Sequence, residues 1–363
     1  MDMSLFFFAS SPAAPAAGPA GDPYRLLLDS AAFADRNGFA AVWTPERHFH
    51  AFGGQYPNPA VVGAALAVTT RRIAIRAGSV VAPLHHAVRL AEEWSVVDNL
   101  SHGRAGVSFA SGWHPVDFTL RPDAYRDRKQ VMAEAVETVR ALWRGGAVAL
   151  AGPDGEPHEV RVFPRPVQAE LPLWITAAGS PDTFRLAGRL GAGLLTHMLS
   201  QDHAALARGI AAYRAELAAC HGEAARGHVA VMVHTLIGPS RDAVRSLVRA
   251  PLREYLRSSL DLVLRSAGSP AGAGGAPLEL SAQDEDFLLD RAFDRYFDGV
   301  GVFGTVDDGV AAVRALEEAG ADEAACLIDF GVPEDDVLAT LPALASVRER
   351  LSAAAPAPAA PAY

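Results

Sequence analysis

The sequence predicts an α/β fold in which eight parallel strands, each followed by a helix, close into a TIM-like (β/α)8 barrel. Short apolar runs typical of buried strands alternate about eight times with helical segments along the 363 residues, and this alternation indicates a parallel sheet. Eight repeats at this length favour a barrel. The alternative is an open, doubly wound sheet, but the G-x-G-x-x-G motif of such sheets does not follow the first predicted strand.

The elements of the first half follow from periodicity and from helix-breaking residues. In the first predicted helix, Leu27, Ala31 and Ala34 recur near a 3.6-residue period. Asn37 and Gly38 then end that helix. Strands are predicted at residues 4–9, 39–43, 73–81 and 104–110, and helices at 24–37, 59–69, 86–100 and 127–143.

The second half continues the same alternation after an interruption. Residues 145–170 contain several glycines and prolines and indicate an excursion, expected to be a hairpin. Strands are predicted at 173–177, 193–197, 229–237 and 324–330, and helices at 181–189, 202–219, 240–265, 287–297, 311–319 and 337–351.

We expect one domain over residues 1–352, with three segments that contribute little to its core. Residues 10–23 are rich in proline, alanine and glycine and are typical of a flexible loop after the first strand. Residues 267–285 begin with AGSPAGAGGAP and are expected to form a mobile lid or insertion. Residues 353–363 are expected to be a disordered Ala/Pro tail.

Composition excludes several classes of protein. Half of the residues are hydrophobic, and the net charge is −10 with a pI near 5.6, which argues against a nucleic-acid partner. No apolar run approaches the roughly 18 residues of a membrane span, and the short apolar start lacks the basic region of a signal peptide. We therefore expect a cytoplasmic protein with no membrane partner, in which Cys220 and Cys326 are reduced thiols.

The first candidate site follows the second predicted strand, where Glu46, Arg47, His48 and His50 crowd together. Ligands of α/β barrels lie at the carboxyl ends of strands, so this cluster is predicted to reach the barrel mouth. The alternative is a polar surface loop. His48 could move a proton, because an imidazole titrates near neutral pH, or it could be structural and hydrogen-bonded to Glu46 or to the backbone.

The histidine pair also raises the question of a metal site. Histidine and aspartate ligands at other strand ends would have to complete it, and His197 and Asp329 have no motif around them. We therefore expect no metal.

Two further clusters follow the fourth and fifth strands. The fourth ends in residues 111–114, Ser-Gly-Trp-His. After the fifth, Gly179 and Ser180 lead into a helix whose first turn carries Thr183. Free N–H groups and the helix dipole at such a turn favour an anion such as phosphate, although an ordinary N-cap explains the turn equally well. Arg128 could supply a cation, or could be a plain surface charge.

The motifs over residues 39–113 resemble the flavin-dependent bacterial luciferase-like monooxygenases. These motifs are W-x-x-E-R-H-F, N-P, P-L-H-H-x-V-R-x-A-E-E, D-x-L-S-x-G-R and G-W-H-P-x-D-F. The resemblance extends over roughly residues 3–350. It is greatest to the subgroup of natural-product pathways, often attached to nonribosomal peptide or polyketide synthases, which RAFDRYFDGVGVFGT and EAACLIDFGV also fit.

The resemblance implies a TIM-like barrel of the luciferase type that binds reduced FMN at the carboxyl ends of its strands. A separate flavin reductase would supply the FMNH2. Oxygen would then add at the flavin C4a position to give a (hydro)peroxyflavin, which transfers one oxygen atom to the substrate. The substrate would be a natural-product intermediate, free or tethered to a carrier protein. A homodimer formed through early barrel helices is also expected.

The resemblance also assigns residues. Gly78-Ser79 matches a frequent non-proline cis peptide bond, residues 179–183 match the phosphate turn, and Arg128 matches a phosphate-contacting arginine. The expected cofactor-binding residues are Gly78, Ser79, Ala110, Ser111, Arg128, Ala178, Gly179, Ser180, Thr183 and Met198. The expected catalytic residues are His48 first and His114 second, with Arg47 and Glu46, and the expected substrate residues are Phe8, Trp113 and His114.

Two positions depart from bacterial luciferase itself. Two adjacent histidines follow the corresponding glutamate there, but here the first position is Arg47 and only His48 keeps the second. The reactive cysteine position of strand four is Ala110. Light emission from an aldehyde is therefore not expected. A deazaflavin (F420)-dependent oxidoreductase of the same superfamily and a non-catalytic flavin-binding or interaction module remain alternatives.

Overall fold

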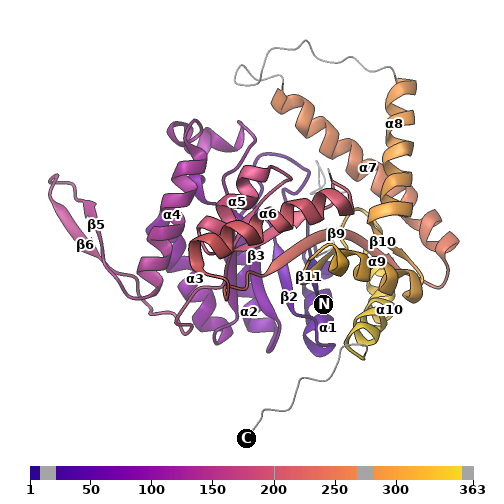
Figure 1. The fold of residues 1–363 in the computed structure, drawn as a ribbon, viewed down its shortest axis with the longest axis horizontal. Helices are drawn as coiled ribbons and strands as arrows, with labels where there is room; N and C mark the ends of the chain where they lie inside the picture. Colours follow the sequence, from indigo (N-terminus) through magenta and orange to yellow (C-terminus); the bar gives the residue numbers. More distant parts are fainter. Residues whose placement is uncertain (9–21, 200, 268–281, 354–363) are drawn as a thin grey trace, which may run out of the picture.

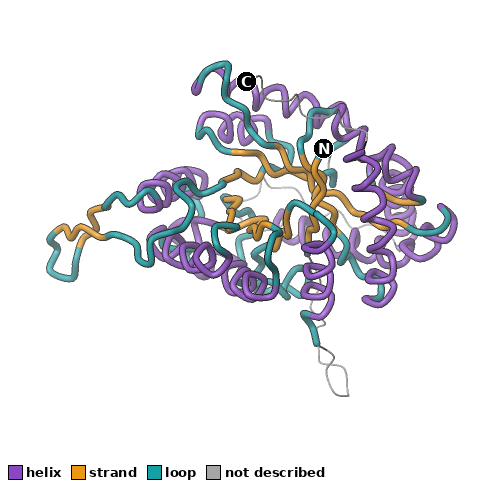
Figure 2. The backbone as a smooth tube through the Cα atoms, turned by 90° about the horizontal axis from the view of Figure 1, so that it is seen from below, coloured by secondary structure: helices purple, strands orange, loops and turns teal. Residues whose placement is uncertain are grey.

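The computed structural model describes residues 1–8, 22–199, 201–267 and 282–353, and within these ranges the predicted barrel is present (Figures 1 and 2). Eight strands run parallel to their neighbours, and the last pairs with the first to close the sheet. They are β1 (Asp2–Phe6), β2 (Ala41–Thr44), β3 (Ala74–Val81), β4 (Ala105–Ala110), β7 (Leu173–Thr176), β8 (Gly193–His197), β9 (Val229–Ile237) and β11 (Glu323–Leu327).

Helices follow the strands and surround the barrel (Figure 2). Several begin where a polar side chain accepts hydrogen bonds from free amides, such as Asn58, Asp202 and Thr305. The helices are α1 (Arg25–Arg36), α2 (Pro59–Thr69), α3 (Ala87–Ser101), α4 (Arg128–Trp143), α5 (Pro181–Arg189), α6 (His203–His221), α7 (Arg241–Ala267), α8 (Ala282–Arg295), α9 (Val306–Glu318) and α10 (Glu334–Ala353). Short 3-10 turns lie at Ala82–Leu84, Asp117–Leu120 and Pro122–Ala124, and a π turn at Tyr296–Val300.

A buried carboxylate holds together the amino end of the barrel interior. Glu323 accepts hydrogen bonds from Ser4 Oγ at 2.5 Å, Trp43 Nε1 at 2.7 Å and Arg76 Nη1 at 2.7 Å. Burial opposes ionisation, but the charges of Arg76 and His228 and these hydrogen bonds lower the pKa of Glu323. The floor of the barrel interior, its amino end, therefore carries an ionised carboxylate that accepts hydrogen bonds from three side chains.

The strand register identifies the side chains above this floor. Paired residues of parallel strands share a face, and alternate residues of one strand face opposite sides. Glu323 pairs with Ala230 of β9, so His234, four residues further along, also points inside. Counted in this way, the interior positions toward the carboxyl ends are Phe6, Gly78, Ser108, Ala110, Thr176, His197 and His234.

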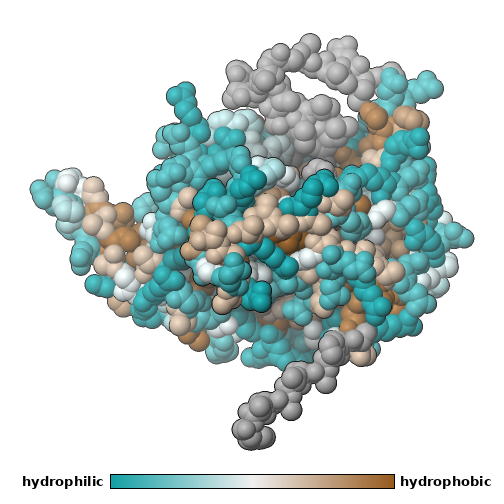
Figure 3. Space-filling view, viewed as in Figure 1, coloured by the Kyte–Doolittle hydropathy of each residue, from teal (hydrophilic) through white to brown (hydrophobic). Residues whose placement is uncertain are grey.

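The structure adds detail where the sequence pattern was weak. The predicted excursion is a hairpin of β5 (Val148–Ala151) and β6 (Pro157–Val160), which projects from the barrel (Figures 1 and 2). A short strand that was not predicted, β10 (Val302–Gly304), pairs with β9. The exposed apolar side chains include Phe163 beyond the hairpin and Phe287 on α8, and Figure 3 shows apolar surface over both regions.

Several predicted boundaries change, among them those of the expected lid. Residues 282–285 of the expected lid are the first turn of α8, and residue 267 ends α7. The remainder of the lid, 268–281, lies outside the described residues, as do 10–21 of the first loop and 354–363 of the tail. Among the described helices, none is long and apolar enough to cross a membrane.

Candidate functional site

Glu46 is a buried hub at the carboxyl end of β2. Its side chain is completely inaccessible to solvent. One carboxylate oxygen accepts from Nε2 of His48 at 2.8 Å and from Nε2 of His85 at 2.7 Å, and the other accepts from the backbone N–H of Val81 at 2.8 Å. The loops after β2 and β3 are therefore fixed to each other by one side chain.

The hub also sets the charge of its members. Burial would raise the pKa of Glu46, but the hydrogen bonds from His48, His85 and Val81 outweigh it, so this pKa is lowered. Burial would lower the pKa of His85, yet the hydrogen bond and charge of Glu46 raise it. The hydrogen bond to Glu46 that was considered for His48 is thus present, and His85 binds the same carboxylate oxygen. His86 caps α3 by accepting from the N–H of Val88.

Arg47 is buried at the barrel mouth beside an aspartate and a tryptophan. Its Nη1 lies 3.3 Å from Oδ2 of Asp117, and its guanidinium lies 5.2 Å from the Trp113 ring centroid. Its Nε and Nη2 are buried without a hydrogen-bond partner. Gly53 adopts φ +78°, and a Cβ there would come within 2.8 Å of Phe8 and 3.1 Å of Arg47. The close approach of this loop therefore requires glycine.

His114 lies beside Arg47 and has an unpartnered nitrogen of its own. It is 7% exposed, and its Nε2 has no hydrogen-bond partner. Burial, followed by the charges of Arg47 and His50, lowers the pKa of His114. Trp113, whose ring lies 5.4 Å from that of His114, is 44% exposed. The mouth thus presents unpartnered buried N–H donors next to an accessible aromatic ring.

The wall formed by β3, β4 and β7 carries small residues. The expected non-proline cis peptide bond is present at Gly78-Ser79, beside a register shift between Gly78 and Val80. A Cβ at Gly78 would lie 2.7 Å from the Phe6 ring, so only glycine fits. Ala110 ends β4 and Ser111 follows it, with an Oγ that lies 3.5 Å from the Gly112 carbonyl oxygen. A planar ring system could lie against such a wall.

The turn before α5 offers free backbone donors at the surface. Gly179 adopts φ +95°, and Ala178, Gly179 and Ser180 are exposed. Ser180 occupies the N-cap position, but its side chain makes no capping bond, so the hydroxyl is available. The N–H of Thr183 already donates to the Ser180 carbonyl oxygen at 3.0 Å, so any anion would use other amides of this turn.

The remaining expected residues lie at other strand ends. Arg128 stacks on Tyr125 at 4.8 Å and donates to the carbonyl oxygens of Gly112 and Tyr125. Met198 is buried after β8. Phe8 follows β1, packs on Phe52 at 5.1 Å and donates its N–H to Oδ1 of Asp329 at 2.6 Å. All of these positions therefore belong to the carboxyl end of the barrel.

Sequence reasoning missed the part played by His85, Asp117 and His234. Asp117 lies 70 residues from Arg47 in the chain, and no local pattern joins them. His234 is the one ionisable residue within the run VAVMVHTLI, and that contrast was the available signal. Among the described residues, no group of three or more His, Cys, Asp or Glu side chains is placed to bind a metal.

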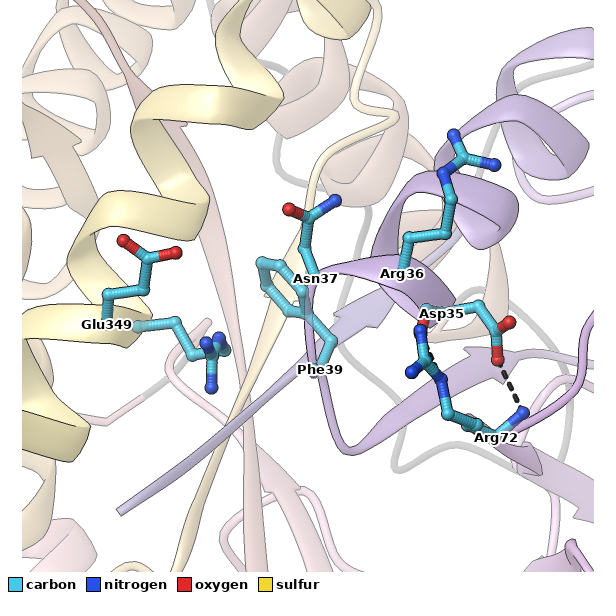
Figure 4. Close-up of a pocket in the computed structure, with 8 residues that line it drawn as sticks. Asp35, Arg36, Asn37, Phe39, Arg72 and Glu349 are labelled. Atoms are coloured by element: carbon cyan, nitrogen blue, oxygen red, sulfur yellow. Dashed lines mark hydrogen bonds between the residues drawn. The ribbon is translucent and has the colours of Figure 1, made fainter.

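A cavity of about 360 Å³ lies at the opposite end of the barrel (Figure 4). Phe39 and Arg72, which line it, precede β2 and β3, and Arg348 comes from α10. The carboxylate of Asp35 is held there by the backbone N–H groups of residues 71–73. Active sites of such barrels lie at the carboxyl ends of the strands, whereas this cavity lies at the amino ends. We therefore assign the cavity a structural role.

The fold and the polar groups at its strand ends define an α/β-barrel protein with a candidate site at the barrel mouth. The family model for luciferase-like monooxygenases matches residues 1–323. The chain belongs to that family, which assigns it an oxidoreductase role of the monooxygenase type and identifies it as a flavoprotein.

Two relatives illustrate the range of this similarity. The 4-hydroxyprotoasukamycin monooxygenase of Streptomyces nodosus subsp. asukaensis is 28% identical over 300 residues, which cover 80% of this chain and 76% of that protein. The oxygenase component of the flavin-dependent trigonelline monooxygenase of Acinetobacter baylyi is 30% identical over 46% of this chain and 47% of its own length.

Solved structures show the same fold. Monooxygenase RslO1 from Streptomyces bottropensis matches with a TM-score of 0.76 at 23% identity, over 97% of this chain and 100% of that one. The oxygenating constituent of 3,6-diketocamphane monooxygenase from Pseudomonas putida, in complex with FMN, matches with 0.72 at 19% identity, over 96% and 98%. An F420-dependent secondary alcohol dehydrogenase matches with 0.67 at 18% identity, over 96% and 99%.

Proposed function

We propose that this chain is the oxygenase of a two-component FMNH2- and O2-dependent monooxygenase that acts on a natural-product intermediate, free or tethered to a carrier protein. The observation that carries the proposal is Arg47, a buried cation at the barrel mouth with two unpartnered N–H donors. Native structures leave few such donors unused, so these are suited to a ligand. Reduced FMN, when bound, would supply the electrons that activate oxygen.

The residues present fit that cofactor. The wall that contains Gly78 and Ala110 would face the flavin ring, and the turn at 178–180, with Arg128, would hold the phosphate. The first relative and the trigonelline enzyme are both monooxygenases by name, and the latter is an oxygenase component, which supports a separate reductase.

Each side chain of the mouth then has a defined task. Arg47 would stabilise negative charge that develops during oxygen transfer, because a preorganised donor in a water-poor site is effective at this. Glu46 would hold His48 in one orientation through its Nε2, leaving the other ring nitrogen to hold or move a proton. Trp113 and Phe8 would contact the substrate.

The test begins with anaerobic titration of the protein with FMNH2 and, in parallel, with reduced F420. Tighter binding of FMNH2 is expected, whereas preference for F420 would favour the deazaflavin alternative, for which the F420-dependent neighbour is the motive. Candidate substrates, free and carrier-bound, are then incubated with FMNH2 and ¹⁸O2, and the masses of the products are measured by mass spectrometry. One labelled oxygen atom in a product supports the proposal. Absence of any product, with normal FMNH2 binding, would favour the non-catalytic module.

A matched pair of variants tests the role of Arg47. Arg47→Met should retain FMN binding but release more hydrogen peroxide per product formed. Arg89→Met serves as the control, because Arg89 is an exposed residue of α3. An equal ratio of hydrogen peroxide to product in both variants would show that Arg47 has no role in oxygen transfer.

A further inference from the structure

The barrel mouth has a second polar group that the proposed flavin site does not use. His234 of β9 points into the barrel and is 1% exposed. Its ring lies edge-on to three aromatic rings, with centroid distances of 4.6 Å to Tyr255, 5.2 Å to Tyr296 and 5.4 Å to Phe330. The side chain is therefore enclosed largely by aromatic rings, and His197 is a titratable group near it.

Two buried polar atoms of this cluster have no partner. These are Nε2 of His234 and the hydroxyl of Tyr296. Two other buried tyrosines are satisfied: Tyr56 donates to Asp329 at 3.2 Å, and Tyr213 donates to the Ala192 carbonyl oxygen at 2.8 Å. Because native interiors rarely leave such groups unsatisfied, the pair is suited to a bound molecule.

The cluster is continuous with the site around Arg47. Tyr255 of α7 contacts Phe52 at 4.8 Å, and Phe52 contacts Phe8 at 5.1 Å. The Phe8 ring in turn lies against Gly53, the residue that packs on Arg47. A series of contacting aromatic rings therefore connects one polar group to the other.

The charge state of the pair restricts what it can recognise. Burial and the charge of nearby His197 lower the pKa of His234 to about 3, and burial raises that of Tyr296. Both groups are uncharged near neutral pH. The Asp329 carboxylate interacts with Tyr255 in the same cluster, which further disfavours an anion.

We propose that His234 and Tyr296 form one part of the substrate site of this enzyme, where they hydrogen-bond an uncharged oxygen, such as a ketone or phenol oxygen, of a ring-bearing substrate packed against Tyr255 and Phe330. The proposal rests on the proposed function, because it places the substrate in contact with the aromatic rings that lead to Arg47. The Tyr296 hydroxyl donates to this oxygen. Carboxylates and phosphates are excluded as the recognised group.

The test measures binding of three small probes to the full chain without flavin by ligand-observed NMR. Acetophenone carries the ketone, ethylbenzene lacks the oxygen, and benzoate carries a charge. Tyr296→Phe and His234→Phe should each weaken acetophenone binding about fivefold, which is the effect of one hydrogen bond. Ethylbenzene binding should stay within about twofold of that of the unmodified protein, and benzoate should bind more weakly than acetophenone.

Tyr213→Phe is the matched control, because it removes a buried hydroxyl that has a partner. It should lower thermal stability and leave acetophenone binding unchanged, whereas Tyr296→Phe should leave stability unchanged or raise it. Equal acetophenone affinity in the unmodified protein and in both site variants would overturn the proposal, as would preference for benzoate. FMNH2 binding is measured separately, so loss of flavin binding with a persistent probe effect refutes only the proposed function.

Discussion

Replacement of His234 by phenylalanine should change how the stability of the protein depends on pH. The unfolded chain binds a proton at this histidine near pH 6.5, whereas burial delays protonation of the folded protein to about pH 3. Below pH 6.5 the unfolded state therefore binds more protons, and the free energy of unfolding falls as pH falls. The contribution is fully present above pH 6.5 and is lost toward pH 3.

The magnitude follows from the size of the shift. One pH unit corresponds to about 1.4 kcal/mol, so this histidine should cost about 2 kcal/mol between pH 6.5 and 5. His234→Phe lacks this term. Its unfolding free energy, relative to that of the unmodified protein, should rise by about 2 kcal/mol from pH 7 to pH 5. His197, whose pKa is also lowered by burial, is present in both proteins and cancels.

Urea unfolding followed by tryptophan fluorescence at pH 5, 6 and 7 measures the difference. His158→Phe is the control, because His158 lies on the projecting hairpin with 56% of its side chain exposed, and it should leave the pH dependence unchanged. If His234→Phe and the unmodified protein lose stability in parallel, the imidazole is not buried as described and the reasoning fails.

Three further predictions concern charged groups. Glu46→Gln should lower the pKa of His85 measured by NMR titration, since burial then acts without the opposing carboxylate. Glu93→Gln should lower this pKa less. An unchanged pKa of His85 in Glu46→Gln would contradict the proposed coupling between Glu46 and His85. Asp35→Ala should lower the free energy of unfolding measured in urea by about 3 kcal/mol, because the carboxylate accepts from three backbone N–H groups. The difference from the unmodified protein should shrink as pH falls through the lowered pKa of Asp35. A difference below about 1 kcal/mol at neutral pH would contradict this prediction. Ion pairs join α8 to four arginines of α7, Arg245, Arg249, Arg253 and Arg257. Because salt screens such pairs, raising NaCl from about 0.05 to 0.5 M should speed amide hydrogen exchange in α8 but not in the barrel strands.

The barrel was predictable because its signals are local. Each strand is an apolar run and each helix shows a 3.6-residue period or a capping residue, and these patterns survive without knowledge of neighbours. The strand β10 was missed because three residues, Val302–Gly304, carry no period. The α7–α8 ion pairs were readable, since arginines recur every four residues from 241 to 257, but the partner helix could not be chosen from the pattern.

The candidate site was predictable only as a set of strand ends. Glu46 and His85 are 39 residues apart, and Arg47 and Asp117 are 70 apart, so their pairing depends on the order of strands around the barrel. Unpartnered atoms are harder still to foresee. Whether His234 finds a hydrogen-bond partner depends on the rings of Tyr255 and Tyr296, which come from segments beyond β9.

Arginine at position 47 has a consequence for pH dependence. A histidine there would change charge near neutral pH, whereas an arginine stays charged even though burial lowers the pKa of Arg47. The charge offered to the reacting groups is therefore constant across the physiological range. The pKa of His85 is raised, so its charged interaction with Glu46 is complete at low pH and is lost as pH rises through this raised pKa. A basic limb of the activity profile should accordingly respond to Glu46→Gln, while Arg47→Met should lower activity at every pH without moving the limb.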